Sequence, residues 1–274
     1  MTKIVSARGA EIPALGLGTW ELRGDECARI VLEALRIGYR HIDTAAMYQN
    51  EEAVGAALMA SGIPRDDIFV TTKVWLDEVG PGSLQASAEA SLLRLGLEQV
   101  DLLLVHWPPG GMAVADMIEP LVDAQQRGLT RHIGVSNFPT TLLQAADVVS
   151  NQTLVTNQCE YHPYLNQDLV LSMCQRFGLS FTSYCPIGRG EAFTEPVLTE
   201  IARAHDKSPA QIVLRWHVEQ NGVIAIPRTR RSERLAENLD IFDFSLATDE
   251  MEAISALTNK NHRICDYGFS PQWD

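Results

Sequence analysis

Four residues have side chains that could act together in catalysis: Asp43, Tyr48, Lys73 and His106. Asp43, Lys73 and His106 each stand at the end of a strand-like segment, in GYRHID, IFVTTK and VDLLLVH, and the three ends are about 30 residues apart. This spacing is typical of βα units, whose parallel strands all end at the same edge of a sheet. We therefore expect the four side chains to meet at one mouth of that sheet.

These residue types suit the delivery of a proton to a carbonyl oxygen. A buried Lys73 ammonium beside the Tyr48 phenol favours the phenolate, so we expect the pKa of Tyr48 to lie below its usual value of about 10. Asp43 would be the counter-ion that keeps Lys73 charged in an apolar setting. His106 would orient the substrate oxygen by donating a hydrogen bond. No side chain stands out as a nucleophile, so a cofactor would have to supply the electrons.

Other interpretations of these residues stay open. Any one of the four residues could cap a loop or satisfy a local hydrogen bond. Such a role explains poorly why all four would lie at the same mouth of the sheet. His41 and Asp43 alternate onto one face of a strand and imitate a metal-hydrolase motif, but no second histidine completes it, so we expect no metal. Tyr48 is not followed by a lysine four residues later, which excludes the short-chain dehydrogenase pattern.

The elements that must position these residues alternate along the chain. After a small hairpin formed by KIVS and EIP, eight apolar strand-like segments each precede a helical pattern. Nearly continuous apolar strands are typical of a parallel sheet that is covered on both faces. The expected strands are ALGLG, HID, IFVTTK, VDLLLVH, HIGVS, LVTNQCE, LSFTSY and GVIAIP. We predict one domain over residues 1–274: an α/β fold of the (β/α)8 TIM barrel type with an N-terminal β-hairpin plug and two extra helices.

A doubly wound sheet is the competing fold. It usually carries G-x-G-x-x-G after its first strand, where the glycines allow the backbone to approach a dinucleotide. Here the segment 16–21, GLGTWE, lacks the third glycine, and the segment 188–190, GRG, does not match either. A nucleotide cofactor would therefore have to bind by another route.

Four arginines after the last expected strand offer such a route. They lie in the segment 228–234, RTRRSER, in a chain of net charge −13. Barrels often bind phosphate at this position, on the N-terminus of a short helix, and Ser232 is a suitable N-cap for it. Several arginines suit the 2′-phosphate of NADP(H) better than NAD(H). A solvated basic surface and a phosphorylated sugar substrate are the alternatives.

Composition sets the remaining limits. The 274 residues are 46% hydrophobic, which is enough for a large core. No apolar run reaches membrane-spanning length and the first residues lack a secretory apolar region, so we expect a cytoplasmic protein without membrane contact. Five widely spaced cysteines favour reduced thiols over disulfides or a zinc site. The acidic charge disfavours a nucleic-acid partner.

Several segments from about residue 3 to the C-terminus resemble the aldo-keto reductase family: GYRHIDTAAMYQNEEAVG, TTKVW, LLLVHWP, IGVSNF, TNQCEYHP and IPRTRRSERLAEN. The short length and the ending SPQWD resemble most the bacterial branch of B-type 2,5-diketo-D-gluconate reductases, whose relatives also reduce methylglyoxal. The resemblance implies a monomeric, NADPH-dependent oxidoreductase (EC 1.1.1.-) that reduces small aldehydes and ketones to alcohols.

The resemblance also implies a role for each matching residue. Tyr48 would be the proton donor, tuned by Asp43 and Lys73, and His106 would orient the substrate. The substrate would contact Trp20, Tyr48, Trp75, His106 and Trp107. The cofactor would contact Gly18, Thr19 and Asp43 near the nicotinamide, Ser136, Asn137 and Gln158 at its carboxamide, Tyr184 on its ring, Cys185, Pro186, Ile187 and Gly188 along the pyrophosphate, and Arg228, Thr229, Arg230, Arg234, Glu237 and Asn238 around the adenosine 2′-phosphate and the adenine.

The chain departs from the family pattern at three places. Cys185 stands where many members have serine, and both the loop after His106 and the tail after Leu257 are short. Larger members enclose the substrate with these two segments, so we expect an open pocket that accepts several small carbonyl compounds. A non-catalytic NADP(H)-binding redox sensor on the same barrel is the alternative function.

Overall fold

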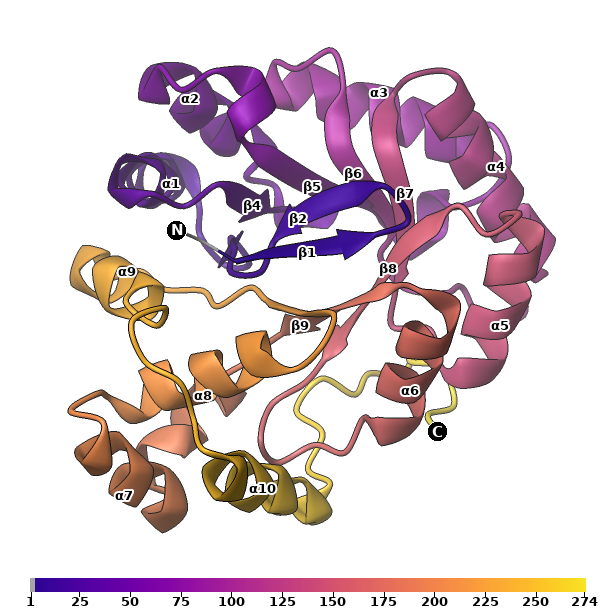
Figure 1. The fold of residues 1–274 in the computed structure, drawn as a ribbon. Coiled ribbons are helices and arrows are strands. Elements are labelled where there is room, and N and C mark those ends of the chain that lie inside the picture. The colour runs from indigo at the N-terminus through magenta and orange to yellow at the C-terminus, as the bar shows by residue number, and fades with distance from the viewer. Residues whose placement is uncertain (1–2) are drawn as a thin grey trace.

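A ring of parallel strands surrounded by helices forms the body of the protein (Figure 1). The structure is a computed structural model that describes residues 3–274, apart from the side chains of residues 191 and 192. Eight strands pair in parallel in the order of the sequence: β3 (Leu17–Gly18), β4 (His41–Asp43), β5 (Phe69–Val74), β6 (Val100–Val105), β7 (Thr130–Ser136), β8 (Leu154–Glu160), β9 (Ser180–Tyr184) and β10 (Val223–Ala225).

The ring is closed between its first and last strands. Leu15 forms a parallel bridge with Ala225, and the Gly16 amide donates a hydrogen bond of 2.9 Å to the Ala225 carbonyl. A doubly wound sheet reverses its strand order at a switch point, whereas here every strand lies beside its neighbours in sequence. The predicted (β/α)8 barrel is therefore confirmed.

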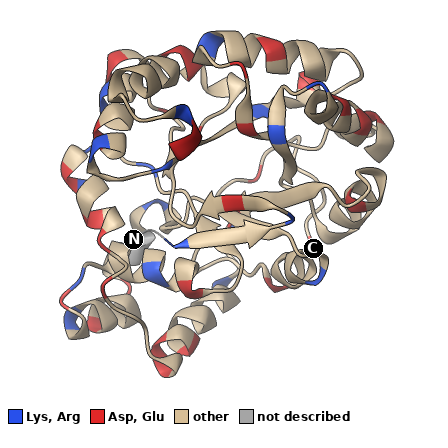
Figure 2. Cartoon of the chain, turned by 45° about the horizontal axis from the view of Figure 1, so that its top comes forward, with Lys and Arg blue, Asp and Glu red and all other residues tan. Residues whose placement is uncertain are grey.

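Helices follow the strands as the sequence pattern predicts. They are α1 (Gly24–Ile37), α2 (Glu51–Ser61), α3 (Ser83–Leu95), α4 (Val114–Gln126), α5 (Thr140–Val149), α6 (Asp168–Phe177), α8 (Pro209–Glu219) and α9 (Ser232–Leu239). Two further helices, α7 (Pro196–Ala204) and α10 (Thr248–Ala256), pack together beside α8. The charged residues lie mostly on these helices and on the loops around the barrel (Figure 2). Within residues 3–274, no helix combines the length and the apolar content that a membrane span needs.

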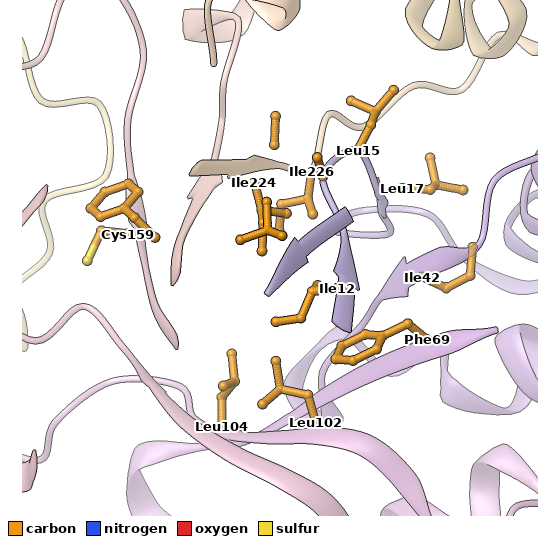
Figure 3. Close-up of a cluster of buried hydrophobic side chains, with 14 of the residues drawn as sticks. Ile12, Leu15, Leu17, Ile42, Phe69, Leu102, Leu104, Cys159, Ile224 and Ile226 are labelled. Carbon is orange, nitrogen blue, oxygen red and sulfur yellow. The ribbon is translucent and has the colours of Figure 1, made fainter. Parts of the chain in front are cut away.

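The predicted hairpin consists of β1 (Ile4–Ala7) and β2 (Ala10–Pro13), and it crosses one end of the barrel (Figure 1). The Ile12 side chain points into the core near Phe69, Leu102 and Leu104 (Figure 3), and Phe69 is the first residue of β5. His41 also belongs to this end, because its ring lies 3.4 Å from the Pro13 carbonyl and 3.2 Å from the Thr71 hydroxyl. The hairpin therefore plugs the end opposite to the carboxyl ends of the strands.

One predicted helix cap is wrong. Helix α9 begins at Ser232, but its N-cap is Arg231, and the Ser232 hydroxyl accepts a hydrogen bond of 2.8 Å from Arg29 instead. The Thr229 hydroxyl accepts from the Arg231 amide at 3.1 Å and so takes over part of the capping. The long Arg29 side chain, on α1, is a partner that spacing along α9 does not reveal.

Candidate active site

Asp43, Tyr48, Lys73 and His106 meet at the carboxyl ends of adjacent strands, as predicted. Asp43 ends β4, Lys73 is the last residue but one of β5, and His106 directly follows β6. Tyr48 ends a single 3-10 turn, Ala46–Tyr48, in the loop after β4. All four side chains are buried. The barrel therefore holds them on rigid strand ends and one tight turn.

The Lys73 ammonium joins this group together. It donates to Asp43 Oδ1 at 2.5 Å, to the Thr44 carbonyl at 2.8 Å and to the Tyr48 hydroxyl at 3.3 Å. The other carboxylate oxygen of Asp43 accepts from Gln158 Nε2 at 2.7 Å. Asp43 is thus fixed from two sides, and the counter-ion predicted for Lys73 is confirmed.

The expected fall in the pKa of Tyr48 is wrong for this structure. Burial, followed by the negative charge of Asp43, raises the pKa of Tyr48 well above 10. Loss of hydration around the buried phenol is the main cause, since it disfavours the charged phenolate, and the Asp43 carboxylate beside Lys73 adds to the rise. Burial also lowers the pKa of Lys73, although Asp43 opposes that shift. The phenol is therefore protonated at neutral pH and has an ammonium within hydrogen-bond reach.

His106 is held as a neutral ring. Burial, helped by the Lys73 charge, brings the pKa of His106 well below 6.5. Its ring stands edge-on to Tyr48, with centroids 5.5 Å apart, and to Trp75, at 5.1 Å. Nδ1 is buried and has no hydrogen-bond partner among the described residues. His106 and Tyr48 line the same cavity, and a neutral imidazole carries one N–H that can donate a hydrogen bond to a ligand there.

A cavity of about 610 Å³ opens over these residues. The three tryptophans predicted as its wall, Trp20, Trp75 and Trp107, all line it. The cavity also has a lining that sequence reasoning missed, and much of it comes from the C-terminal tail and the loop after β9: Met47, Arg189, Phe193, Cys265, Tyr267 and Phe269. The aromatic-rich ending YGFSPQW was the one sequence signal that could have indicated them.

The tail reaches the cavity although it is short. Phe269 packs edge-on against Trp75 and Trp107, with centroids 5.6 and 5.3 Å apart. Upstream, the buried Glu160 carboxylate accepts hydrogen bonds from the backbone amides of Ile264 and Cys265, both at 2.6 Å. The pocket is consequently more enclosed than the tail length indicates.

The far end of the tail is also fixed. The Asp274 carboxylate accepts from the Thr140 amide at 2.9 Å, at the first turn of α5. Arg263 stacks on Trp273, with its guanidinium carbon 3.7 Å from the ring centroid. Such contacts on both sides of Tyr267 and Phe269 hold the two rings over the cavity.

Most of the residues predicted for a dinucleotide lie along one side of the same cavity. Tyr184, at the end of β9, donates a hydrogen bond of 2.8 Å to Asn137, whose amide donates at 3.0 Å to Ser136. This lining comprises Gly18, Thr19, Asp43, Ser136, Asn137, Gln158, Tyr184, Cys185, Pro186, Ile187, Arg228 and Arg234. It runs from an aromatic ring and amides to two guanidinium groups, a donor set that fits an elongated anion with a planar ring.

Five predicted cofactor residues do not line the cavity in this structure: Gly188, Thr229, Arg230, Glu237 and Asn238. Glu237 accepts from the Ser208 hydroxyl at 2.5 Å and so ties α9 to α8. Arg230 donates to the Glu21 carbonyl at 3.2 Å, and Arg228 pairs with the Glu21 carboxylate. The arginine cluster is thus linked to the loop after β3.

In the described part of the chain, no group of three or more histidine, cysteine or acidic residues is arranged to hold a metal ion.

Comparison with known proteins gives this geometry a context. Residues 14–259 match the profile described as "Aldo/keto reductase family". The chain is 39% identical to methylglyoxal reductase DkgB of Salmonella typhimurium, over 96% of this chain and 99% of that protein. A solved structure provisionally named 2,5-diketo-D-gluconic acid reductase B superimposes with a TM-score of 0.97 at 45% identity, covering 100% of this chain and 98% of that one. A Gox0644 variant in complex with NADPH gives 0.91 at 37% identity, covering 97% of both chains.

Proposed function

The chain belongs to the aldo/keto reductase family, and from that premise we propose that it uses NADPH to reduce small aldehydes and ketones to alcohols. Methylglyoxal and 2,5-diketo-D-gluconate are the candidate substrates, because similar proteins carry these names. The observation that carries the proposal is the contact of Lys73 with both Asp43 and Tyr48, beside a neutral His106, on one cavity.

Tyr48 is the proposed general acid. Its phenol is protonated at neutral pH and lies 3.3 Å from the Lys73 ammonium. As the phenol gives its proton to the substrate oxygen, negative charge grows on the tyrosine oxygen, and the ammonium is already in place to stabilise it. An interaction that strengthens as charge develops accelerates the chemical step itself. Asp43 and Gln158 act behind this pair, because they fix the position of the ammonium.

His106 is proposed to aim the carbonyl. A neutral ring donates from Nε2 without placing a second positive charge beside Lys73. The tryptophans around it would exclude water from the reacting carbon and leave room for a small substrate. The hydride itself would be supplied by NADPH when it is bound.

Several of the lining residues are proposed to hold the cofactor. Tyr184 would stack on the nicotinamide, and Ser136, Asn137 and Gln158 would bind its carboxamide. Arg228 and Arg234 would bind the adenosine 2′-phosphate, since guanidinium groups form paired hydrogen bonds with phosphate oxygens. Arg228 lines the cavity and is paired with the Glu21 carboxylate in this structure, so the phosphate would take the place of that carboxylate.

Residues 1–274 are proposed to act as one domain and as a monomer in the cytoplasm. The closure of the ring between Leu15 and Ala225 supports one folding unit, because it needs both ends of the chain. The five cysteines are free thiols, as expected in a reducing compartment. Light scattering coupled to gel filtration tests the oligomeric state: a mass of about twice 30.3 kDa would contradict the monomer.

The decisive experiment replaces Tyr48 by Phe. NADPH consumption would be followed with methylglyoxal, 2,5-diketo-D-gluconate and an aromatic aldehyde, and NADPH binding by fluorescence. Turnover should be lost while NADPH binding is retained. Tyr39→Phe is the matched control, since it removes a buried hydroxyl that does not line the cavity and should keep turnover. Binding without turnover in the unmodified protein would favour the sensor function, and weak binding without preference between NADPH and NADH would favour a phosphorylated sugar.

A further inference from the structure

Two cysteines from distant parts of the chain meet on the cavity wall. Cys185 directly follows β9, and Cys265 belongs to the C-terminal tail. Their thiols lie near enough to perturb each other's pKa, and both residues line the cavity that contains Tyr48. This contact joins the barrel wall to the segment that covers it.

A cation lies against the pair. Arg189 Nη2 donates to Cys265 Sγ at 3.8 Å, and Cys185 lies near enough to the same guanidinium to interact with its charge. Low-pKa, accessible cysteines next to positive groups are the ones that oxidants attack, particularly where a second cysteine stands ready to resolve the product. The neighbouring Cys265 thiol lowers the pKa of Cys185 although burial opposes this, and the same interaction raises the pKa of Cys265. Cys185 is also the more accessible of the two, because it is half-buried whereas Cys265 is buried, so Cys185 is suited to attack and Cys265 to resolve.

The backbone fixes both partners. Cys185 has a φ of +50°, a conformation that few residues other than glycine adopt readily, and it lines the cavity. The Cys265 amide is held by the buried Glu160 carboxylate at 2.6 Å. A disulfide has a sulfur–sulfur bond of about 2.05 Å, so the two thiols must approach each other further before they join.

The other three cysteines are in a different situation. Cys27, Cys159 and Cys174 are buried away from this cavity. Burial raises the pKa of Cys27 and of Cys159 to about 12. They provide an internal comparison within the same protein, because they should stay thiols under conditions in which Cys185 reacts.

We propose that Cys185 and Cys265 form a peroxide-sensitive thiol pair that closes to a disulfide and locks the tail onto the cavity wall. The Cys185 thiolate attacks one oxygen of hydrogen peroxide, which breaks the O–O bond, forms a sulfenic acid and releases water after proton uptake. The Cys265 thiol then attacks the Cys185 sulfur, an S–S bond replaces the S–O bond, and a second water leaves. Two thiols lose two electrons together, and one peroxide is reduced to two waters.

The disulfide would change access to the cavity. Cys185 adjoins Tyr184, and Cys265 precedes Tyr267, so the cross-link fixes two walls of the cavity to each other. The thiol chemistry is independent of the proposed reductase activity. Only the expected effect on the cofactor rests on that proposal: NADPH should bind the oxidised protein at least about tenfold more weakly, because the wall along its expected path can no longer adjust.

The test exposes the full-length protein to hydrogen peroxide and counts its thiols. The free thiols should fall from five to three, the mass should decrease by two hydrogens, and peptide mapping should show Cys185 joined to Cys265. A dithiol reductant should restore all five. Cys265→Ser should stop the reaction at a sulfenic acid on Cys185 that dimedone traps, whereas the matched control Cys159→Ser should still form the cross-link.

Three results would overturn the proposal: five free thiols after peroxide treatment, a disulfide that involves Cys27, Cys159 or Cys174, or a cross-link between two chains. Should Cys265→Ser fail to fold, alkylation of the unmodified protein still decides the matter. Iodoacetamide should label Cys185 at least about tenfold faster than Cys159, because Cys185 is only half-buried and lies near the Arg189 guanidinium, whereas Cys159 is buried. Equal labelling rates would contradict the assignment of Cys185 as the attacking thiol.

Discussion

The side-chain amide of Gln158 donates a hydrogen bond of 2.7 Å to the carboxylate of Asp43. The two residues lie on β8 and β4, four strands apart in a ring of eight, so the bond spans the mouth of the barrel. It leaves the second carboxylate oxygen to Lys73. Asp43 therefore connects the proposed cofactor side of the cavity with the proposed proton donor.

Asp43→Asn should remove activity and much stability. The buried ammonium of Lys73 would lose its only carboxylate partner among the described residues, and breaking a buried ion pair from one side costs about 3–5 kcal/mol. Because burial already lowers the pKa of Lys73, that pKa should fall further. Steady-state turnover across pH and urea unfolding check both effects. Turnover with an unshifted high-pH limit would contradict the role of Asp43.

Glu160→Gln should loosen the tail. An amide offers one acceptor oxygen where the carboxylate binds two backbone amides and His162, so Tyr267 and Phe269 should lose their fixed position. We expect KM for the carbonyl substrate to rise about tenfold with a smaller change in kcat, together with faster proteolysis of the tail. Glu195→Gln, which removes a surface pair with Lys260, is the matched control and should change neither.

Arg234→Gln should weaken NADPH binding much more than NADH binding. The guanidinium lines the cavity and is not engaged in an ion pair within residues 3–274, so it is available to a 2′-phosphate. Loss of a charge-assisted hydrogen bond costs about 1.5–3 kcal/mol, or about 10- to 100-fold in Kd. Fluorescence titration measures both constants, and Arg215→Gln on α8 serves as control. A parallel loss for both nucleotides would rule out the 2′-phosphate as the ligand of Arg234.

Acid should destabilise the protein through its buried histidines. Burial lowers the pKa of His41 and His106, and brings the pKa of His217 to about 3. As the pH falls below about 6.5, the unfolded chain binds protons that the native state does not, so stability falls with falling pH. Each such group contributes up to about 1.4 kcal/mol per pH unit until the folded pKa is reached.

His217→Gln isolates one of these contributions. Urea unfolding at pH 7 and pH 5 should show a smaller loss of stability in the variant than in the unmodified protein, by about 1–2 kcal/mol. The replacement can still donate to the Pro186 carbonyl, which His217 Nε2 contacts at 3.0 Å. An identical loss in both proteins would show that His217 is not one of the groups responsible.

Much of the proposed site was predictable because it depends on local sequence. The alternation of strand and helix patterns places Asp43, Lys73 and His106 at strand ends, and a parallel barrel brings such ends to one mouth. The tryptophans near those ends were predictable for the same reason. Ser232 was misassigned because a cap depends on which side chain reaches the helix start, and Arg29 comes from another helix.

The sequence by itself determined the barrel, the four polar residues at its mouth and the arginines beyond the last strand, since these follow from periodicity and spacing along the chain. Only the tertiary structure decided the direction of the pKa shift of Tyr48, the bond between Gln158 and Asp43, the return of the tail over the cavity and the meeting of Cys185 with Cys265. Each of these depends on groups far apart in sequence and on the water excluded around them. The spacing of residues along the sequence does not show which distant groups meet or how much water is excluded around them.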